Sequence, residues 1–344
     1  MSHLLKEFRG QVQLVYIDPP FDSKAEYKKT ISLRGASAAS SHSAFEEKQY
    51  TDIWTNDEYL QFMYERFVIM RELLSENGSF YLHCDYRRSH HLRCLLDEVF
   101  GDSCLRNQIV WQKTRVSKGQ SLDFGRVHDI ILLYSKGSSP IFNPQYEGYS
   151  EEYVDSHYNL TDAKTGRRYG LWDLTQAGPG PARRFVDKLL EPPPGKHWIW
   201  SQERIDEGLA SGKIEFTQQG TPRLRRYLDE AKGKRLSDLW TDIFDINSMA
   251  LERLNYPTQK PEALLERIIE ASSNPGDLVF DCFMGSGTTQ AVALRLGRRF
   301  IGADINLGAV QIATKRLLTL AAELAPTTQQ LALLPTADGR PVTD

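Results

Sequence analysis

The sequence predicts a doubly wound α/β fold with a mostly parallel sheet and an inserted region, and three observations lead to it. Short apolar segments rich in β-branched residues alternate with segments of helical periodicity, which is typical of βαβ units. Two predicted strands end in an acidic residue followed by a tight turn, at 18–20 and 281–287. Between them lies a long region rich in Tyr, Trp, Gly, Pro and Arg, in which the alternation stops.

Length and composition are those of an ordinary globular protein. The 344 residues predict two domains, or one large α/β domain with an insertion. No apolar run approaches the ~20 residues of a membrane span, and no signal peptide is visible, so we expect a cytoplasmic protein without a membrane partner. The 4 cysteines form no Cys-x-x-Cys pair, which argues against a metal site and a disulfide framework. With a net charge of −3, any nucleic-acid surface must be a local basic patch.

The first clear strand ends in Asp18, Pro19, Pro20 and Phe21. Residues 14–17 are an uninterrupted apolar run, which predicts a central strand buried on both faces. Proline has no N–H to donate, so the two prolines end the strand and stiffen its tip. An acid, rigid carbonyls and a ring at such a tip suit the binding of a planar base by its exocyclic amine. The alternative is a strand-ending turn in which Asp18 caps a neighbour and Phe21 packs.

The polar segment 22–49 follows this tip and lacks periodicity, so we expect a mobile loop. It is either a lid that orders on binding or a plain surface loop. The rest of the first half, 1–139, is expected to contain helices at 58–74 and 89–99 and strands at 79–83, 107–111 and 128–135.

The region 140–246 departs from this pattern and carries aromatic residues and pairs of cations. Basic groups interleaved with aromatic rings suit phosphate contacts and base stacking, although a solvated charged face is the alternative. The candidate DNA-binding residues are Arg183, Arg184, Arg225 and Arg226. The candidate anchors of a small separate core are Trp172, Trp198, Trp200 and Trp240.

The alternation returns in the last part of the chain, 247–324. We expect a helix that begins at 261–262, strands at 278–283 and 299–304, and helices at 290–296 and 307–324. The tail, 325–344, contains Pro, Thr and Gln and is expected to be disordered.

The strand at 278–283 leads into a glycine loop that is typical of nucleotide-binding βαβ units. Gly285 and Gly287 let the backbone approach a ligand, and the following helix offers N–H groups to a carboxylate or phosphate. Asp281 and Asp304 are 304 − 281 = 23 residues apart, close to the spacing of about 20 between such a strand and its ribose-binding acid. No lysine follows Gly287, as a phosphate-binding P-loop requires, and the third glycine of the dinucleotide motif is missing. S-adenosylmethionine, with a ribose and a carboxylate but no phosphate, fits better; a turn without a ligand is the alternative.

These motifs together resemble a known family, the permuted (β-class) amino-methyltransferases of DNA, or DNA methylase N-4/N-6 family of restriction–modification systems. The similar segments, in the family's order, are Asp18-Pro19-Pro20-Phe21, Tyr81-Leu82-His83-Cys84-Asp85, Thr258-Gln259-Lys260-Pro261 and Asp281-Cys282-Phe283-Met284-Gly285-Ser286-Gly287-Thr288. The resemblance covers nearly the whole chain. It implies a Rossmann-like methyltransferase sheet whose catalytic half is 1–139, whose cofactor-binding half is 247–324, and whose target-recognition region is 140–246.

The resemblance also implies roles for the motif residues. Asp18, Pro19, Pro20 and Phe21 would grip an adenine flipped out of duplex DNA, for methyl transfer from S-adenosylmethionine to N6. The residues implied in cofactor binding are Thr258, Lys260, Asp281, Phe283, Gly285, Ser286, Gly287, Thr288 and Asp304. Adenine N6 is favoured over cytosine N4 because cytosine-specific members more often carry serine or threonine in place of Asp18. No cysteine lies in a Pro-Cys loop, which argues against attack on cytosine C5.

Other functions stay open at this point. Family members carry a Gly-Asp strand ahead of the catalytic strand, and the sequence begins after its position, which allows a catalytically silent DNA- or nucleotide-binding subunit. A methyltransferase for RNA or for a protein amide is a further alternative. Duplex DNA is the expected partner, and the family is compatible with a homodimer and a cognate restriction endonuclease. The enzyme hypothesis requires Asp18 and Gly285 to face one cleft from neighbouring strand tips.

Overall fold

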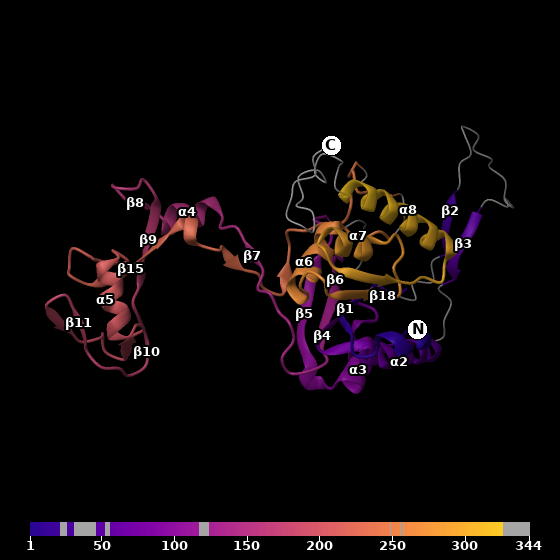
Figure 1. The fold of residues 1–344 in the computed structure, drawn as a ribbon, viewed down its shortest axis with the longest axis horizontal. Coiled ribbons are helices and arrows are strands. Elements are labelled where there is room, and N and C mark those ends of the chain that lie inside the picture. Colours follow the sequence, from indigo (N-terminus) through magenta and orange to yellow (C-terminus); the bar gives the residue numbers. More distant parts are fainter. Residues whose placement is uncertain are drawn as a thin grey trace, which may run out of the picture. The chain divides into compact units, whose positions relative to one another are not determined.

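The computed structural model describes residues 1–20, 26–30, 46–51, 56–116, 124–247, 249–254, 256 and 258–325, with the backbone alone at 26–30, 46–51 and 56. The chain divides into two compact units. The larger comprises Met1–Gln145 together with the chain from Ser237 onward, and the smaller is Tyr146–Leu236 (Figure 1).

A seven-stranded sheet forms the centre of the larger unit. Its strands are β1 (Val12–Ile17), β4 (Leu74–Cys84), β5 (Leu105–Gln112), β6 (His128–Ser135), β17 (Leu239–Trp240), β18 (Leu278–Asp281) and β19 (Arg299–Gly302). Their order is β17-β5-β6-β4-β1-β18-β19, and every neighbouring pair is parallel except the two that involve β6. The predicted mostly parallel α/β sheet is confirmed.

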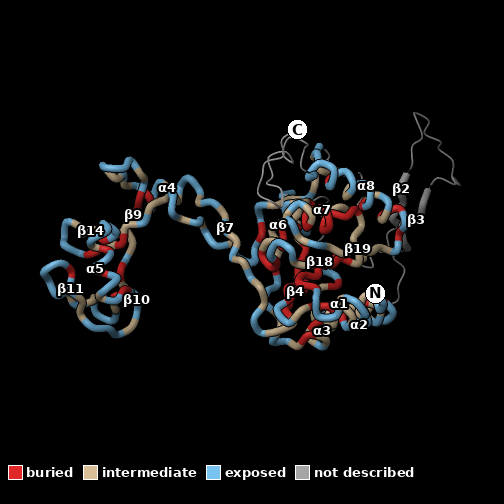
Figure 2. Tube along the Cα trace, viewed as in Figure 1, coloured by how far each residue is buried: buried red, intermediate tan, exposed pale blue. Residues whose placement is uncertain are grey.

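Helices cover both faces of this sheet (Figure 1). The helices α2 (Asn56–Leu73) and α3 (Ser89–Phe100) pack on one face through a cluster that includes Phe67 and Leu92. On the other face, α6 (Glu262–Ser272) and α7 (Thr288–Arg295) pack through Ile268 and Val292, and α8 (Leu307–Leu324) contacts α7. The sheet between them is the most deeply buried part of the unit (Figure 2). No helix in the described ranges is long and apolar enough to span a membrane.

The strand β1 lies in the middle of this sheet, and five of its six residues are apolar; the exception is Gln13, whose Nε2 donates to the Asn77 carbonyl at 2.8 Å. Its side chains alternate between the two faces, so Val15 and Ile17 join the cluster under α2 and α3. Leu14 and Tyr16 join the opposite cluster under α6 and α7. A strand buried on both faces favours apolar residues on both of them, and the predicted central strand is confirmed.

Short elements complete the larger unit. They are a 3₁₀ turn at Ser2–Leu4, α1 (Leu5–Phe8), a 3₁₀ turn at Asp102–Cys104, β2 (Glu26–Thr30) and β3 (Glu46–Thr51). β2 and β3 pair in antiparallel fashion, so the expectation of a continuous loop over 22–49 is wrong for the strand residues. The remainder of that segment and most of the predicted tail, 326–344, lie outside the described residues.

The smaller unit is built from short strands around a four-stranded antiparallel sheet of order β14-β15-β9-β8. Its elements are β7 (Tyr146–Glu147), α4 (Glu151–His157), β8 (Leu160–Thr161), β9 (Arg168–Asp173), β10 (Thr175–Ala177), β11 (Arg183–Phe185), β12 (Lys188–Leu190), β13 (Lys196–Trp198), α5 (Gln202–Ala210), β14 (Ile214–Phe216), β15 (Pro222–Tyr227), a 3₁₀ turn at Leu228–Glu230 and β16 (Lys234–Arg235). Trp198 and Trp200 are buried in its core, and Trp172 packs against them.

Trp240 does not belong to that core, and its assignment there from the sequence is wrong. It lies in β17, which pairs with β5 in the main sheet and places Trp240 opposite Trp111. The compact unit therefore spans 146–236, inside the predicted limits of 140 and 246.

Candidate active site

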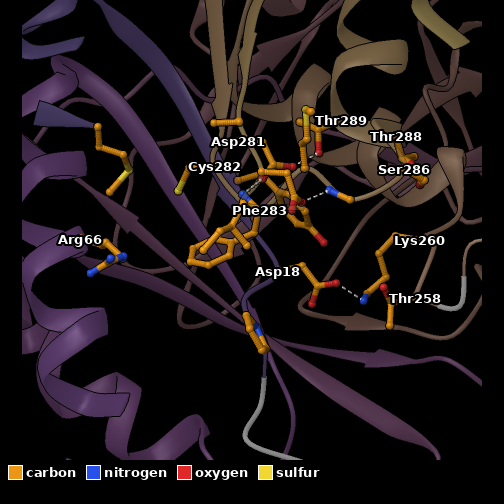
Figure 3. A pocket seen from close by; sticks show the side chains of 18 of the residues that line it. Asp18, Arg66, Thr258, Lys260, Asp281, Cys282, Phe283, Ser286, Thr288 and Thr289 are labelled. Atoms are coloured by element: carbon orange, nitrogen blue, oxygen red, sulfur yellow. Dashed lines mark hydrogen bonds and ion pairs between the residues drawn. The ribbon is translucent and has the colours of Figure 1, made fainter. Parts of the chain in front are cut away.

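A cavity of about 650 Å³ opens at the carboxyl ends of β1 and β18 (Figure 3). These strands are parallel neighbours, with Val15 opposite Phe280, so the turns that follow them lie side by side. Asp18 and Gly285 both line the cavity. The geometric requirement stated from the sequence is met, and the volume lies in the range of small-molecule sites.

Most of the residues predicted from the motifs line this cavity. They are Asp18, Pro20, Thr258, Lys260, Asp281, Phe283, Gly285, Ser286, Thr288 and Asp304. Pro19 and Gly287 are adjacent to lining residues but do not line the cavity themselves, and Phe21 lies outside the described residues. Their parts in binding and catalysis stay predictions.

Asp18 and Lys260 form a largely buried ion pair in which Nζ of the lysine donates to Oδ2 of the aspartate (Figure 3). Burial alone would lower the pKa of Lys260, but the charge and hydrogen bond of Asp18 outweigh it and raise that pKa. The other oxygen, Asp18 Oδ1, is buried and has no hydrogen-bond partner among the described residues. A buried acceptor without a partner is costly, so this oxygen suits an N–H donor from a ligand.

Asp281 holds the glycine loop in place through two hydrogen bonds. Its Oδ1 accepts the Phe283 N–H at 2.9 Å, and its Oδ2 accepts the Thr289 hydroxyl at 2.6 Å (Figure 3). Burial raises the pKa of Asp281 to about 7 against the effect of these two bonds, and the charges of Asp18 and Asp304 raise it further. Asp281 therefore holds the loop in shape and carries a carboxyl that titrates near neutral pH.

The loop itself requires glycine at two positions, Gly285 and Gly287, which have φ values of +48° and +74°. A Cβ at Gly287 would lie 2.7 Å from the Cβ of Ala313 in α8. Asp304 Oδ2 accepts the Gly285 N–H at 2.9 Å and ties the loop to the end of β19. The backbone of the loop is thus exposed to a ligand and fixed from behind.

Several cavity residues carry no prediction from the sequence. Tyr16, Phe62, Arg66 and Tyr256 all line the cavity, and the Arg66 guanidinium lies over the Phe62 ring, 3.2 Å from its centroid. Strand periodicity could have found Tyr16, which lies two residues before Asp18. Phe62 and Arg66 lie on α2, where a single aromatic or basic residue gives no signal.

The cations predicted to contact DNA differ from one another in the structure. Arg225 forms ion pairs with Glu215 at 2.6 Å and Asp162 at 3.2 Å. Arg226 is exposed and lies over the Trp172 ring, 5.4 Å from its centroid. Arg225 is therefore bound within the unit, whereas Arg226 is accessible.

The other predicted pair lies on the β11–β12 hairpin. The Arg184 N–H donates to Gln202 Oε1 at 2.8 Å, and Gln202 Nε2 donates to the Arg184 carbonyl at 2.7 Å, which fixes the hairpin to α5. The Arg184 residue is exposed, and Arg183 is half-buried.

The smaller unit contains a cavity of its own, of about 440 Å³. Rings of Tyr149, Tyr158 and Trp200 line it, and the Arg204 guanidinium lies 4.6 Å from the Trp200 ring centroid. The exposed cations that line it are Arg204, Lys213, Arg226 and Lys232. Within the described part of the chain, none of these four pairs with a carboxylate. Nor do any three His, Cys, Asp or Glu side chains in that part form a metal-binding group.

A family model described as DNA methylase, of the N6 and N4 type, matches residues 12–315. The chain belongs to the DNA methylase family. This match spans both halves of the larger unit and the whole of the smaller one, and it confirms the resemblance found in the motifs.

Several DNA methylases are similar to the chain along most of its length. The type II methyltransferase M.EcaI of Enterobacter cloacae is 34% identical over 310 residues, 89% of this chain and 64% of that protein. The Mod subunit of the type III restriction-modification enzyme StyLTI of Salmonella typhimurium is 23% identical over 319 residues, 86% of this chain and 48% of that protein. The chain thus spans less than two-thirds of the one relative and about half of the other.

The DNA adenine methyltransferase YhdJ of Escherichia coli (strain K12) is 26% identical over 317 residues, 92% of this chain and 80% of that protein. Among solved structures, that of the M1.HpyAVI–SAM complex has a TM-score of 0.47 at 19% identity, and the match covers 92% of this chain and 95% of the other.

Proposed function

We propose that this DNA methylase transfers a methyl group from S-adenosylmethionine to the exocyclic N6 of adenine in duplex DNA. The observation that carries the proposal is the cavity that Asp18 shares with the glycine loop, in which Asp18 Oδ1 has no hydrogen-bond partner from the described part of the chain. The similarity to a DNA adenine methyltransferase, YhdJ, over 92% of the chain supports adenine as the target.

The cavity fits S-adenosylmethionine by its chemistry. That molecule carries two cationic groups, a carboxylate and a ribose. Asp281 and Asp304 supply acceptors, and the N-terminus of α7 supplies N–H groups for the carboxylate. When bound, the cofactor supplies an electrophilic methyl group on its sulfonium. Thr258, Phe283, Ser286 and Thr288 complete the proposed binding residues.

Asp18 and its neighbours prepare the amine. The exocyclic amine of a base is a weak nucleophile because its lone pair is delocalised into the ring. Asp18 Oδ1 accepts one N–H, while Lys260 holds Oδ2 and thus fixes the plane of the carboxylate. The Pro19 carbonyl accepts the second N–H, so the lone pair is localised and aimed by position and electrostatics. Phe21 stacks on the flipped base, a contact worth about 1–3 kcal/mol.

The smaller unit is the proposed target-recognition region. Its accessible cations beside aromatic rings suit phosphates and bases, and they include Arg226 and Arg184 of the residues predicted from the sequence. Arg204, Lys213 and Lys232 join them, and Arg183 stays a candidate, while Arg225, which forms two ion pairs within the unit, is assigned to its framework.

We also propose partner proteins for this activity. The names of M.EcaI and the StyLTI Mod subunit support a cognate restriction endonuclease as a partner in the same cytoplasmic compartment. A homodimer stays a prediction from the family.

The test is methyl transfer from labelled S-adenosylmethionine to unmethylated duplex DNA, followed by mass spectrometry of the nucleosides. We expect N6-methyladenine. N4-methylcytosine would move the target to cytosine, and transfer only to RNA or a protein amide would overturn DNA as the substrate. Cofactor binding by calorimetry without transfer would favour a silent subunit. Methylome sequencing of a host that expresses the chain would give the recognition sequence.

A further inference from the structure

An arginine of α8 contacts the glycine loop of the main cavity without lining the cavity itself. Nη1 of Arg316 donates to the Ser286 carbonyl at 3.2 Å and to the Thr288 hydroxyl oxygen at 3.1 Å. Ser286 and Thr288 are buried residues that line the cavity (Figure 3). Only 10% of the Arg316 side chain is exposed. The loop that is proposed to bind the cofactor is therefore held by a largely buried cation from a different helix.

The second nitrogen of the same guanidinium binds a carboxylate. Nη2 of Arg316 donates to Glu262 Oε1 at 2.6 Å, and Nη1 of Arg295 donates to Glu262 Oε2 at 2.6 Å. Burial alone would raise the pKa of Glu262, but the hydrogen bonds and charges of the two arginines outweigh it and lower that pKa. Glu262 is therefore ionised at neutral pH, and its bond with Arg316 is charge-assisted and strong.

Glu262 connects Arg316 to another segment that lines the cavity. It is the first residue of α6 and follows Lys260 and Pro261 directly. Lys260 lines the cavity and pairs with Asp18. Proline restricts the backbone between Lys260 and Glu262, so a bond that holds Glu262 also limits the position of Lys260. Arg316 thus joins the glycine loop to the segment that carries the partner of Asp18.

The geometry of this contact favours arginine over lysine. A guanidinium is a planar fork whose nitrogens reach two acceptors at fixed angles, whereas a lysine ammonium is a single point of charge. The helix α8 also lies close to the loop, because a Cβ at Gly287 would be 2.7 Å from the Cβ of Ala313. Ala313 and Arg316 are three residues apart and share one face of α8. That face therefore contacts the loop through both a small residue and a two-pronged donor.

We propose that Arg316 is a positioning residue for the cofactor. It holds Ser286 and Thr288 in the shape that binds the amino-acid end of S-adenosylmethionine, and Glu262 holds Arg316 in turn. Thr288 Oγ1 accepts from Arg316, which leaves its own hydrogen for another acceptor, such as the cofactor carboxylate. The identity of the ligand as S-adenosylmethionine rests on the proposed function, whereas the ordering of the loop by Arg316 does not.

Calorimetry with two ligands tests this role. The first is S-adenosylmethionine, and the second is 5′-methylthioadenosine, which shares the adenosine and the sulfur but lacks the amino acid. Arg316→Met keeps the apolar stem and removes the donors, so we expect the dissociation constant of S-adenosylmethionine to rise about tenfold and that of methylthioadenosine to change less than about twofold. Arg316→Lys should still show a rise of about fivefold, because one ammonium cannot replace the fork. A general loss of structure would weaken both ligands equally, and that result would overturn the inference.

Arg295→Met is the matched control, because Arg295 pairs with the same carboxylate but makes no bond to the loop in the described structure. It should bind S-adenosylmethionine within about twofold of the wild type. Glu262→Gln should raise the dissociation constant about threefold, since an acceptor remains but the charge is lost. Adding it to Arg316→Met should change nothing further, because the bond that it weakens is already gone. A double variant whose effect is the product of the two single effects would refute the assignment of Glu262.

Amide hydrogen exchange of the ligand-free protein gives a readout that needs no cofactor. Arg316→Met should speed the exchange of the hydrogen-bonded Gly285 and Gly287 amides about tenfold, whereas Arg295→Met should not. Unchanged exchange at these two amides overturns the inference, even where cofactor binding weakens. If Arg316→Met does not fold, Arg316→Lys gives the same test with a smaller expected change. A protein in which Arg316 orders the loop but which methylates no DNA would refute the proposed function and leave this ordering standing.

Discussion

The two units use their charged residues in opposite ways. In the larger unit, Asp18, Asp281 and Asp304 come from distant parts of the sequence and line one cavity. In the smaller unit, the adjacent cations Arg225 and Arg226 have separate fates, one in ion pairs and the other exposed. The position of each acid in the parallel sheet determines that the acids line one cavity. The ion pairs of each individual cation determine whether it is accessible.

This difference teaches what kind of motif carries spatial information. An acid that follows a buried parallel strand lies at the carboxyl edge of the sheet, where the ends of neighbouring strands meet. The position of a cation in an irregular, aromatic segment cannot be inferred from the sequence in this way, because its partner depends on which acid the fold brings near. The acids should therefore give large and specific effects when changed, and the cations small and salt-dependent ones.

The largest effect should come from Asp18→Ala. This change removes the acceptor that positions the amine and the carboxylate that pairs with Lys260. We expect kcat to fall on the order of 10³-fold, as for the loss of a preorganised electrostatic contact, while calorimetry shows the dissociation constant of S-adenosylmethionine within about threefold of the wild type. Asp238→Ala, at an exposed aspartate of the same unit, is the control. Unchanged turnover in Asp18→Ala would remove the catalytic assignment.

Asp281 should show its effect in the pH dependence of stability. Its pKa of about 7 in the folded protein lies above the ordinary value of 3.8, so the folded state holds this proton more tightly than the unfolded state. The resulting stabilisation is fully present below pH 3.8 and is lost as the pH rises through about 7.

Asp281→Asn lacks this titration but can still accept from Phe283 and donate to Thr289. The free energy of unfolding of the wild type should therefore fall relative to the variant by a few kcal/mol between pH 4 and 8, at about 1.4 kcal/mol for each pKa unit of the shift. Urea unfolding of both proteins across this pH range measures the difference. Parallel pH profiles would show that Asp281 is not protonated in the folded state.

Strand patterns predicted the frame of the site, and the limits of those patterns explain what was missed. The apolar run at 14–17 identifies β1, because a strand buried on both faces is mostly apolar. Tyr16 belongs to the same apolar run, and this pattern predicts only that it is a core residue. Its partner His83 is 67 residues away, on a strand whose register no local pattern gives.

Trp240 is a residue that the sequence patterns assigned to the wrong unit. Its strand, β17, has two residues, which is too short for any periodicity to appear. Lys213 and Lys232 carry no sequence signal either, because isolated cations are common on every protein surface. Only the fold places them around one cavity.

A smaller effect is expected at Asp304. Asp304→Ala loses the proposed ribose contact together with the bond to the Gly285 N–H. Hydrogen bonds to a charged group contribute more than neutral ones, so we expect the dissociation constant of the cofactor to rise about thirtyfold and kcat at saturating cofactor to change little. Asp304→Asn keeps an acceptor for the Gly285 N–H, so its dissociation constant for the cofactor should lie between those of the wild type and Asp304→Ala. An unaltered dissociation constant in Asp304→Ala would count against the ribose role.

The smallest effect should come from changing cations of the smaller unit. The double variant Arg226→Ala, Lys232→Ala removes two accessible cations that line the cavity of that unit. Phosphate contacts are independent of sequence, so we expect binding to specific and non-specific duplexes to weaken equally, by about tenfold, and the slope of log K against log salt to fall by about 2.

Arg167→Ala is the matched control, because Arg167 already pairs with Asp229 and Glu230 at 2.6 and 2.7 Å. A cation with internal partners has little charge left to neutralise a phosphate, so this variant should bind DNA within about twofold of the wild type with an unchanged salt slope. Fluorescence anisotropy at several salt concentrations measures both quantities. If Arg167→Ala weakened binding as much as the double variant, internal pairing would not determine which cations of the smaller unit contact DNA. The proposed contrast between the two units would then be wrong for the smaller one.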